Sequence, residues 1–386
     1  MRFLHTADWH LGRVYRGRSL LEDQAHLLEQ FCLLVRDLRP DAVLIAGDVY
    51  DRAIPPADAV RLLDDTLTRI VVGERVPVIL IAGNHDSPER LGFGSRLLDA
   101  SGLIVRGLMQ VEAPPIILRD ADGEVAIHAL PYVDPGRALP LLPELAEEAT
   151  VDPQRVMRAL LDRWRARHNP ARRSVVLAHA YVLGGLASES ERPLALGGAE
   201  CVAAEAFAGV HYVALGHLHR PQSLAGGAVH YAGSLMKYSF DEVDQRKSVT
   251  LATLDGAGKV GLELIPLEPK RDLRLIEGRL EELLARAADD PRRDDYILAR
   301  LLDQGAVLDA MARLRAAYPN ALGIERPLAD EVLAPRAARD HRQIGLRALF
   351  GEFYRDMTGA PLTEAEAQAL DAALTQLAGH GGEADR

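Results

Sequence analysis

Residues 3–10 read Phe3-Leu4-His5-Thr6-Ala7-Asp8-Trp9-His10, an apolar run that passes directly into an aspartate and a histidine. Further short apolar runs follow in the first 240 residues, and each predicts a buried strand: 42–46, 76–82, 125–130, 175–178 and 212–215. Between them lie segments with apolar residues at helical spacing, including 57–71 and the stretch of 27–38 that stops before Pro40. This alternation predicts an α/β fold with layered, buried strands.

Potential metal ligands directly follow five of these strands. They are Asp8 and His10, Asp48, Asn84 with His85, His179, and His217 with His219. In layered α/β folds, ligands bind at the carboxyl ends of the strands, where the loops converge. Carboxylate, amide and imidazole groups suit divalent metals such as Mn, Fe or Zn. Eight groups are too many for one ion with open positions, so we expect two ions with Asp48 between them.

Each of these motifs alone also has an ordinary structural explanation. Asp8-Trp9-His10 is compatible with a helix cap beside a buried histidine, Gly47-Asp48 with a turn, and Asn84-His85-Asp86 with a capping loop. Repetition at five strand ends favours a metal site instead. A glycine precedes the ligand at three of them, and glycine allows close approach to a crowded centre.

The remainder of the chain predicts a hairpin, a small domain and two helices. Segments 248–254 and 260–267 flank Asp255-Gly256-Ala257-Gly258, as in a β-hairpin. Residues 273–325 alternate strand, helix, strand, helix and strand, which is enough for a small α/β domain. Helical stretches near 344–357 and 363–377 precede a polar tail that we expect to be disordered. The expected divisions are 1–269, 270–335, 336–379 and 380–386.

Composition excludes several classes of protein. The 386 residues include 45 Lys and Arg against 56 Asp and Glu, a formal charge of −11, which argues against nucleic-acid binding through bulk positive charge. Cys32 and Cys201 are the two cysteines, too few for a disulfide framework or a Cys-rich zinc module. Residues 1–8 lack the apolar run of a signal peptide, and the longest apolar runs are too short to span a bilayer. We therefore expect a cytoplasmic protein that does not contact a membrane.

In order and spacing, the chain resembles the calcineurin-like binuclear metallophosphoesterases. The motifs that carry this resemblance are Asp8-Trp9-His10, Gly47-Asp48-Val49-Tyr50-Asp51, Gly83-Asn84-His85-Asp86, His179 and Gly216-His217-Leu218-His219. Residues 1–12, 46–51, 212–220 and 231–234 further resemble the SbcD family, the nuclease subunits of bacterial SbcCD DNA-repair complexes. The similarity is dense to about residue 270. It implies a β-sandwich core flanked by helices, a small α/β capping domain at 270–335 and C-terminal helices.

The resemblance also implies roles for individual residues. One metal, most often manganese, would be held by Asp8, His10, Asp48 and His219, and the other by Asp48, Asn84, His179 and His217. Hydroxide activated by both metals would attack phosphorus, and His85 would act as general acid. Asp86 would orient His85, although a helix cap explains it equally well. Asp51 receives no role, because archaeal and eukaryotic relatives carry a histidine there.

The implied activity is that of a double-strand 3′-to-5′ exonuclease and single-strand endonuclease. It would act on DNA ends and hairpins in repair, recombination and replication. Arg13, Tyr15 and Arg16 could contact the DNA backbone, although a solvated loop explains them equally well. The alternative is a stand-alone binuclear phosphodiesterase for nucleotides or small phosphoesters, whereas the complete ligand set argues against a non-enzymatic scaffold.

The C-terminal helices would dock an SbcC-type coiled-coil ATPase, and the subunit would form a homodimer within a heterotetramer. The apolar stripe expected to make this contact is Leu346, Leu349, Phe350, Phe353 and Met357. From the residues alone, a stripe that folds back on its own domain is equally plausible.

Overall fold

The computed structural model describes residues 1–132, 134–145, 152–191, 201–303 and 307–326, together with 347, 350, 351, 354, 361–364, 366–371 and 374. The chain divides into two compact units, 1–299 with 303–324, and 300–302 with 325–386. Of the apolar C-terminal stripe, Phe350 lies within the described residues, whereas its other four members and the tail at 380–386 lie outside them. In the part of the chain that the structure describes, no helix is long and apolar enough to cross a membrane.

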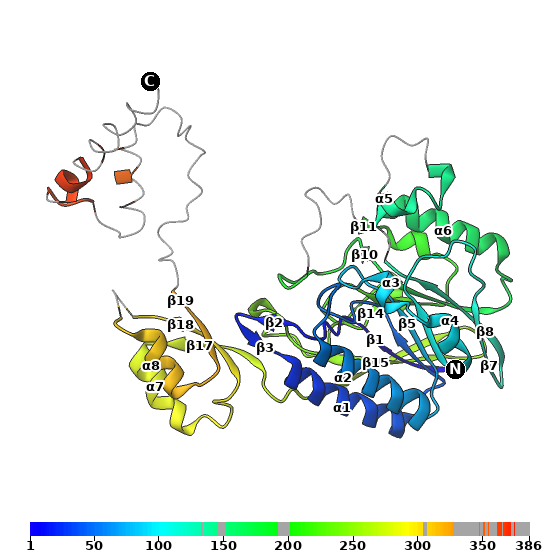
Figure 1. Cartoon of the computed structure of the whole chain (residues 1–386), viewed down its shortest axis with the longest axis horizontal. Helices are drawn as coiled ribbons and strands as arrows, with labels where there is room; N and C mark the ends of the chain where they lie inside the picture. Colours follow the sequence, from blue (N-terminus) through cyan, green and yellow to red (C-terminus); the bar gives the residue numbers. More distant parts are fainter. Residues whose placement is uncertain are drawn as a thin grey trace. The chain divides into compact units, whose positions relative to one another are not determined.

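Two six-stranded sheets form the core of the first unit (Figure 1). The order of the first sheet is β16 (Val260–Pro266), β15 (Ser248–Leu254), β1 (Arg2–Thr6), β4 (Ala42–Ile45), β5 (Val78–Ile81) and β6 (Leu103–Arg106). Strands β1, β4, β5 and β6 run parallel, and the predicted hairpin β15–β16 joins them antiparallel through β1.

The order of the second sheet is β13 (Gln222–Leu224), β14 (Val229–Tyr231), β12 (Tyr212–Gly216), β9 (Arg173–His179), β8 (Gly123–Leu130) and β7 (Ile116–Asp120). One apolar cluster contains buried residues of both sheets, among them Phe3, Leu44, Ile79, Val175 and Tyr212. The two sheets therefore pack face to face as a sandwich, which confirms the expected fold class.

Helices cover the outer faces of this sandwich (Figure 1). α1 (Leu21–Leu38) and α2 (Ala57–Thr68) bury Leu27, Phe31 and Leu63 against the first sheet, and α6 (Pro153–Arg167) buries Leu161 and Trp164 against the second. The shorter elements are β2 (Val14–Tyr15), β3 (Arg18–Ser19), α3 (Pro88–Leu91), α4 (Ser95–Leu98), α5 (Pro135–Ala138), β10 (Tyr181–Val182) and β11 (Cys201–Val202).

Residues 273–325 form a small three-stranded sheet with two helices, called the small unit below, and its order of strands and helices is the one that the sequence predicts. Its elements are β17 (Leu273–Gly278), α7 (Leu280–Arg286), β18 (Tyr296–Leu301), α8 (Ala310–Ala317) and β19 (Ala321–Glu325). It contacts α1 through Asp23, a fully buried carboxylate that accepts two hydrogen bonds of 2.8 Å from Arg271 and one of 2.8 Å from the Tyr296 hydroxyl. Leu273 and Tyr296 also belong to the apolar cluster of α1. These contacts make the small unit continuous with the core.

The described C-terminal residues are helical at positions within both stretches that the sequence predicts. Arg347 contacts Asp371 (Nη2 to Oδ2, 3.0 Å), and the Tyr354 hydroxyl donates to Glu366 Oε1 at 2.6 Å. Thr363 and Glu366 form a reciprocal cap, with the Thr363 N–H 2.8 Å from Glu366 Oε2. Side-chain contacts therefore join the two helical stretches to each other.

Candidate metal centre

The loops after β1, β4 and β5 of the first sheet meet the loops after β9 and β12 of the second. Asp8 N–H donates to the Gly47 carbonyl at 3.1 Å, and the carboxylate of Asp8 accepts the His217 N–H at 3.0 Å. The ring Nδ1 of His179 donates to the Ala46 carbonyl at 2.8 Å. These bonds link both sheets at one end of the sandwich, where all seven predicted metal ligands and His85 lie together.

The ligand loops hold their backbone in unusual conformations. Asp8, His10, Asp48 and His217 have φ values of 52°, 45°, 48° and 104°, a region that side chains with a Cβ adopt only at a cost. A Cβ on Gly83 would overlap the Asp48 carboxylate, so the close approach expected of glycine before a ligand is required here. The surrounding hydrogen bonds offset this strain and fix the ligand directions.

The atoms of the predicted ligands form two overlapping groups, and His10 also belongs to a third group with Asp51 and His85. Those of Asp8, His10 and His219 lie within 4.8 Å of one another, as do those of Asp8, Asp48 and His179. Asp48 Oδ2 is 3.8 Å from His10 Nε2 and 3.5 Å from His179 Nε2, so this oxygen lies between the groups. Asn84 Oδ1 completes the second group, 2.9 Å from His179 Nε2 and 3.0 Å from His217 Nδ1.

The chemistry of this donor set fits divalent cations. Because His179 Nδ1 donates to a carbonyl, Nε2 is the ring nitrogen that faces Asn84 Oδ1 and Asp48 Oδ2, where a cation can take the place of its proton. Two further ring nitrogens face other predicted ligands: His10 Nε2 lies 3.1 Å from His219 Nε2, and His217 Nδ1 lies 3.0 Å from Asn84 Oδ1. Buried imidazole nitrogens and carboxylate and amide oxygens that converge in this way are the donor set that divalent transition metals prefer.

Burial shifts the pKa values of most groups in this centre towards the uncharged form, and His179 is the exception among the four candidate ligand histidines. Burial raises the pKa of Asp8 well above its usual range, and the neighbouring Asp48 carboxylate adds to this effect. Burial acts to lower the pKa of His179, yet the negative charge of Asp48 raises it to about 9. Burial, with His179 close by, lowers the pKa of His217 to about 3 and keeps that ring neutral. A neutral imidazole is the form that binds a metal.

His85 lies beside the candidate ligands, and one of its two ring nitrogens is hydrogen-bonded to the backbone. Its backbone N–H donates to Asp48 Oδ1 at 2.8 Å, and its Nδ1 lies 2.8 Å from the Asp51 carbonyl oxygen. Because a carbonyl can only accept, Nδ1 carries a proton, and Nε2 is the atom left for a substrate. The Asp51 carboxylate approaches His10 Nδ1 at 3.7 Å and Arg13 at 3.2 Å. Asp51, to which the sequence gives no role, therefore holds both His85 and Arg13.

Asp86 bonds to the backbone of the loops that carry Asp48 and His85, so the orienting role expected of it would act through that backbone. Its carboxylate accepts the backbone N–H groups of Val49 (3.1 Å), Tyr50 (2.9 Å) and Gly83 (2.9 Å), whereas the Asp51 carbonyl holds the His85 ring and Ser87 caps α3. Burial, followed by repulsion from Asp48, raises the pKa of Asp86 to about 6. Asp86 thus ties the loop after β4 to the loop after β5.

The three residues expected at DNA lie on or beside the β2–β3 hairpin. Arg13 is largely engaged, since it pairs with Asp51, donates to the Ser190 carbonyl at 3.2 Å and stacks 4.9 Å from the Tyr238 ring. Tyr15 is half-buried, and Arg16 is exposed with its guanidinium 5.3 Å from the Phe240 ring centre. Arg13 therefore lies beside the candidate metal centre, whereas the side chain of Arg16 is exposed to solvent.

The sequence did not reveal several buried residues behind the ligands. Gln24 of α1 donates to the His10 carbonyl at 2.7 Å, and Glu191 accepts the His219 N–H at 2.6 Å. Glu242 lies 2.6 Å from Lys247; burial acts to raise its pKa, but His219 and Lys247 hold it well below the usual range. None of these residues directly follows a buried strand. The pattern used to predict the ligands, a polar residue at the end of an apolar run, therefore does not identify them.

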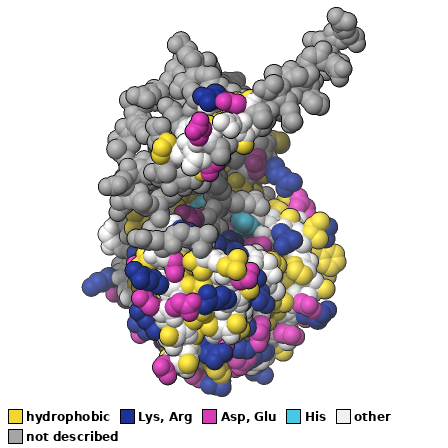
Figure 2. All heavy atoms as spheres, turned by 90° about the vertical axis from the view of Figure 1, so that its left-hand side faces the viewer, with side chains coloured by type: hydrophobic (Ala, Val, Ile, Leu, Met, Phe, Trp, Pro, Cys, Tyr) yellow, Lys and Arg dark blue, Asp and Glu magenta, His cyan; other side chains and the backbone are white. Residues whose placement is uncertain are grey.

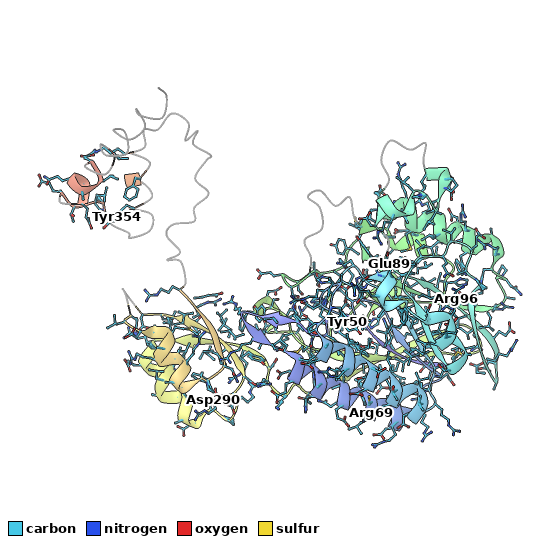
Figure 3. The ribbon with its side chains drawn as sticks, viewed as in Figure 1. Tyr50, Arg69, Glu89, Arg96, Asp290 and Tyr354 are labelled. Carbon is cyan, nitrogen blue, oxygen red and sulfur yellow. The ribbon has the colours of Figure 1, made fainter. Side chains whose placement is uncertain are left out.

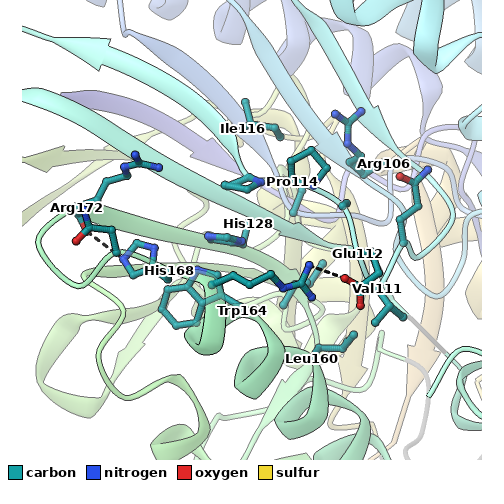
Figure 4. Close-up of a pocket in the computed structure, with 17 residues that line it drawn as sticks. Arg106, Val111, Glu112, Pro114, Ile116, His128, Leu160, Trp164, His168 and Arg172 are labelled. Atoms are coloured by element: carbon teal, nitrogen blue, oxygen red, sulfur yellow. Dashed lines mark hydrogen bonds and ion pairs between the residues drawn. The ribbon is translucent and has the colours of Figure 1, made fainter. Parts of the chain in front are cut away.

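A separate cavity lies between the outer face of β8 and α6 (Figure 4). His128 and Trp164 line it, and Arg167 pairs there with Glu112 at 2.6 Å. None of the predicted site residues lines this cavity. This cavity is therefore separate from the candidate metal centre.

Comparison with known proteins agrees with this geometry. Residues 1–221 match the calcineurin-like phosphoesterase family, and residues 269–358 match the family described as type 5 capsule protein repressor C-terminal domain. The chain is therefore a calcineurin-like phosphoesterase, a class whose members use divalent metals to hydrolyse phosphoesters.

Two relatives define the family more narrowly. The SbcD subunit of the nuclease SbcCD from Staphylococcus saprophyticus is 32% identical over 99% of this chain and 100% of its own length. The corresponding SbcD subunit from Staphylococcus epidermidis is 30% identical over 96% of this chain and 97% of its own length. The chain belongs to the SbcD family of SbcCD nuclease subunits, whose members are phosphodiester hydrolases.

Similar solved structures are more distant. A Thermus thermophilus protein is 15% identical over 68% of this chain and 98% of its own, with a TM-score of 0.38. A dimetal phosphatase from Danio rerio is 16% identical over 69% of this chain and 96% of its own, with a TM-score of 0.42.

Proposed function

We propose that this chain is the DNA-cleaving subunit of an SbcCD-type complex and that it hydrolyses phosphodiester bonds with two manganese ions. The observation that carries the proposal is the convergence of seven side chains with oxygen or nitrogen donor atoms from both sheets, with His85 beside them. This arrangement occurs in a chain that matches the SbcD subunit of an SbcCD nuclease over nearly its full length.

Seven side chains would hold the two ions. Asp8, His10 and His219 would hold one, Asn84, His179 and His217 would hold the other, and Asp48 would contact both. The position of Asp48 Oδ2 between His10 and His179 supports the shared contact. When bound, two such ions lower the pKa of a water and neutralise charge on the phosphate oxygens.

His85 would protonate the departing sugar oxygen. An alkoxide is a poor leaving group, so its departure needs a proton donor in reach. The Asp51 carbonyl holds the Nδ1–H of His85 at 2.8 Å, which fixes the plane of the ring and directs Nε2 outward. Asp86 supports this geometry indirectly, because it joins the loop that carries Asp48 to the loop that carries His85.

The substrate would be DNA, cleaved as a 3′-to-5′ duplex exonuclease and a single-strand endonuclease. Arg16 and the half-buried Tyr15 would contact its backbone, and Arg13 would contact it at the metal centre. Figure 2 shows basic and acidic side chains interspersed over the face in view, in keeping with the formal charge of −11. We therefore expect weak, salt-sensitive DNA binding by the isolated subunit, with the bound cations supplying most of the attraction.

The partners would be an SbcC-type ATPase and a second copy of this chain. The residues after about 340 would carry the ATPase contact. Phe93 and Leu97, which are 87% and 84% exposed, lie on the segment that spans α3 and α4 and would favour self-association. The proposed cellular location is the cytoplasm.

The decisive experiment compares two substrates with the full chain and Mn²⁺. Linear duplex DNA should be degraded in a metal-dependent manner, and EDTA should abolish the degradation. Rapid hydrolysis of nucleotides or other small phosphodiesters without cleavage of DNA would instead favour the stand-alone phosphodiesterase.

A further inference from the structure

A buried polar cluster holds His219 at three points. Its backbone N–H donates to Glu191 at 2.6 Å, and its carbonyl accepts from the Lys247 ammonium at 2.8 Å. The ring Nδ1 lies 2.6 Å from the hydroxyl oxygen of Ser190, which in turn contacts Glu242. Glu242 is fully buried, and Lys247 is 6% exposed.

The donors and acceptors of this cluster determine which group donates in each hydrogen bond. Glu242 Oε2 lies 2.6 Å from the Lys247 ammonium, so Glu242 is a carboxylate and can only accept. The Ser190 hydroxyl must therefore donate its one proton to Glu242 Oε1. Its lone pair then faces His219, and Nδ1 must supply the proton of that bond. In the neutral ring of His219 the lone pair is therefore on Nε2, which faces His10 Nε2 at 3.1 Å.

We infer that Glu242 and Ser190 are positioning residues that hold His219 in the Nδ1–H tautomer and keep Nε2 available to a divalent cation. Histidine ligands commonly donate their second ring N–H to a carboxylate or carbonyl, which fixes both tautomer and ring direction. This inference rests on the proposed role of His219 as a metal ligand.

The other candidate ligand histidines are held differently. His179 donates to the backbone carbonyl of Ala46, and His217 Nδ1 contacts Asn84. His10 Nδ1 has no hydrogen bond within the described part of the chain. Of these four rings, that of His219 is the one hydrogen-bonded through a side-chain hydroxyl to a carboxylate in the described part of the chain, so substitution can remove this support without changing the backbone.

Two distant segments build the relay, and further bonds connect them. The Glu189 N–H donates to Asp241 at 2.9 Å, and the Gln245 side chain donates to the Ser188 hydroxyl at 3.0 Å. These contacts place Ser190 against Glu242, which ends the short 3₁₀ helix Phe240–Glu242. Ser190 is not a nucleophile in this arrangement, because its proton is committed to Glu242 and it contacts the ring nitrogen opposite to the one that faces the centre.

The test uses the metal-free full chain and Mn²⁺ as the probe. The variants are Ser190→Ala, which leaves the Glu242–Lys247 pair intact, Ser190→Thr, which retains the hydroxyl, and Glu242→Gln. Glu205→Gln is the matched control, because Glu205 is an exposed glutamate of another short 3₁₀ helix. Titration calorimetry measures Mn²⁺ affinity, and NMR of ¹⁵N-histidine-labelled protein reports which ring nitrogen of His219 is protonated.

We expect Ser190→Ala and Glu242→Gln to weaken Mn²⁺ binding at one site by roughly 10- to 100-fold. Ser190→Ala should also reduce the fraction of the Nδ1–H tautomer in the absence of metal. Ser190→Thr and Glu205→Gln should retain wild-type affinity and tautomer. Unchanged affinity and tautomer in folded Ser190→Ala would overturn the relay. Retention of both Mn²⁺ ions by His219→Ala would instead overturn the metal assignment on which the relay depends.

Discussion

Replacing His85 with alanine tests the proposed chemistry most directly. The Asp51 carbonyl, 2.8 Å from Nδ1, leaves Nε2 as the nitrogen that can protonate a leaving group. Loss of a positioned general acid lowers the rate by roughly 10²- to 10⁴-fold, which is about 3 to 5 kcal/mol in activation free energy. His85→Ala should therefore lose this factor in the cleavage of duplex DNA, where the leaving group is an alkoxide.

The assay pairs duplex DNA with bis(p-nitrophenyl) phosphate, both under single-turnover conditions with saturating Mn²⁺. Nitrophenolate leaves without a proton, so the same variant should lose less than ~10-fold on this ester. Calorimetry should show that Mn²⁺ binding is largely unchanged, because His85 is not one of the seven proposed ligands. His26→Ala is the matched control, since His26 is exposed on α1, and its rates should equal those of the unaltered chain.

Two results would refute the reasoning. Equal losses on the two substrates would mean that His85 does not act by protonating the leaving group. Loss of Mn²⁺ from the variant would mean that His85 helps to hold metal.

Three further predictions concern stability and assembly. Arg271→Met leaves the buried Asp23 without its cation and should lower the free energy of unfolding in urea by about 3 kcal/mol. Arg69→Ala removes an exposed pair with Glu29 (Figure 3) and should cost about 0 to 1 kcal/mol, so equal losses would contradict the difference in burial. Burial lowers the pKa of His230 to about 4 in the folded chain, whereas the pKa is about 6.5 in the unfolded chain. Between these values the unfolded chain takes up a proton that the folded chain excludes, so the contribution of His230 to the free energy of unfolding is fully retained above pH 6.5 and falls as the pH is lowered towards 4. This contribution should fall by about 2 kcal/mol between pH 7 and pH 5, and His230→Gln should make unfolding less pH-dependent; an unaltered pH dependence would contradict it. A chain that ends at residue 340 should keep Mn²⁺-dependent nuclease activity and lose its ATPase partner, and co-purification of that truncated chain with the ATPase would disprove the docking proposal.

The amino-acid sequence determined the strands of the sandwich and the side chains that follow them. Asp8, Asp48 and His179 could be found because each lies at or next to the end of an apolar run. Such a run is recognised from consecutive residues alone, because the directions of side chains along a strand are set by neighbours in the chain. The hairpin β15–β16 was predictable for the same reason, since its turn and both strands are continuous in sequence.

Only the tertiary structure decided which partners these residues have. Asp8 and Asp48 follow strands of one sheet, whereas His179 and His217 follow strands of the other, and nothing local in the sequence states that the two sheets face each other. The bonds of Asp86 to Val49 and Tyr50 span 37 and 36 residues, and Ser190 reaches Glu242 across 52. Such contacts depend on the packing of whole sheets and leave no periodic pattern in the chain. The sequence therefore specified the candidate ligands, and the packing of the two sheets decided how those side chains are held.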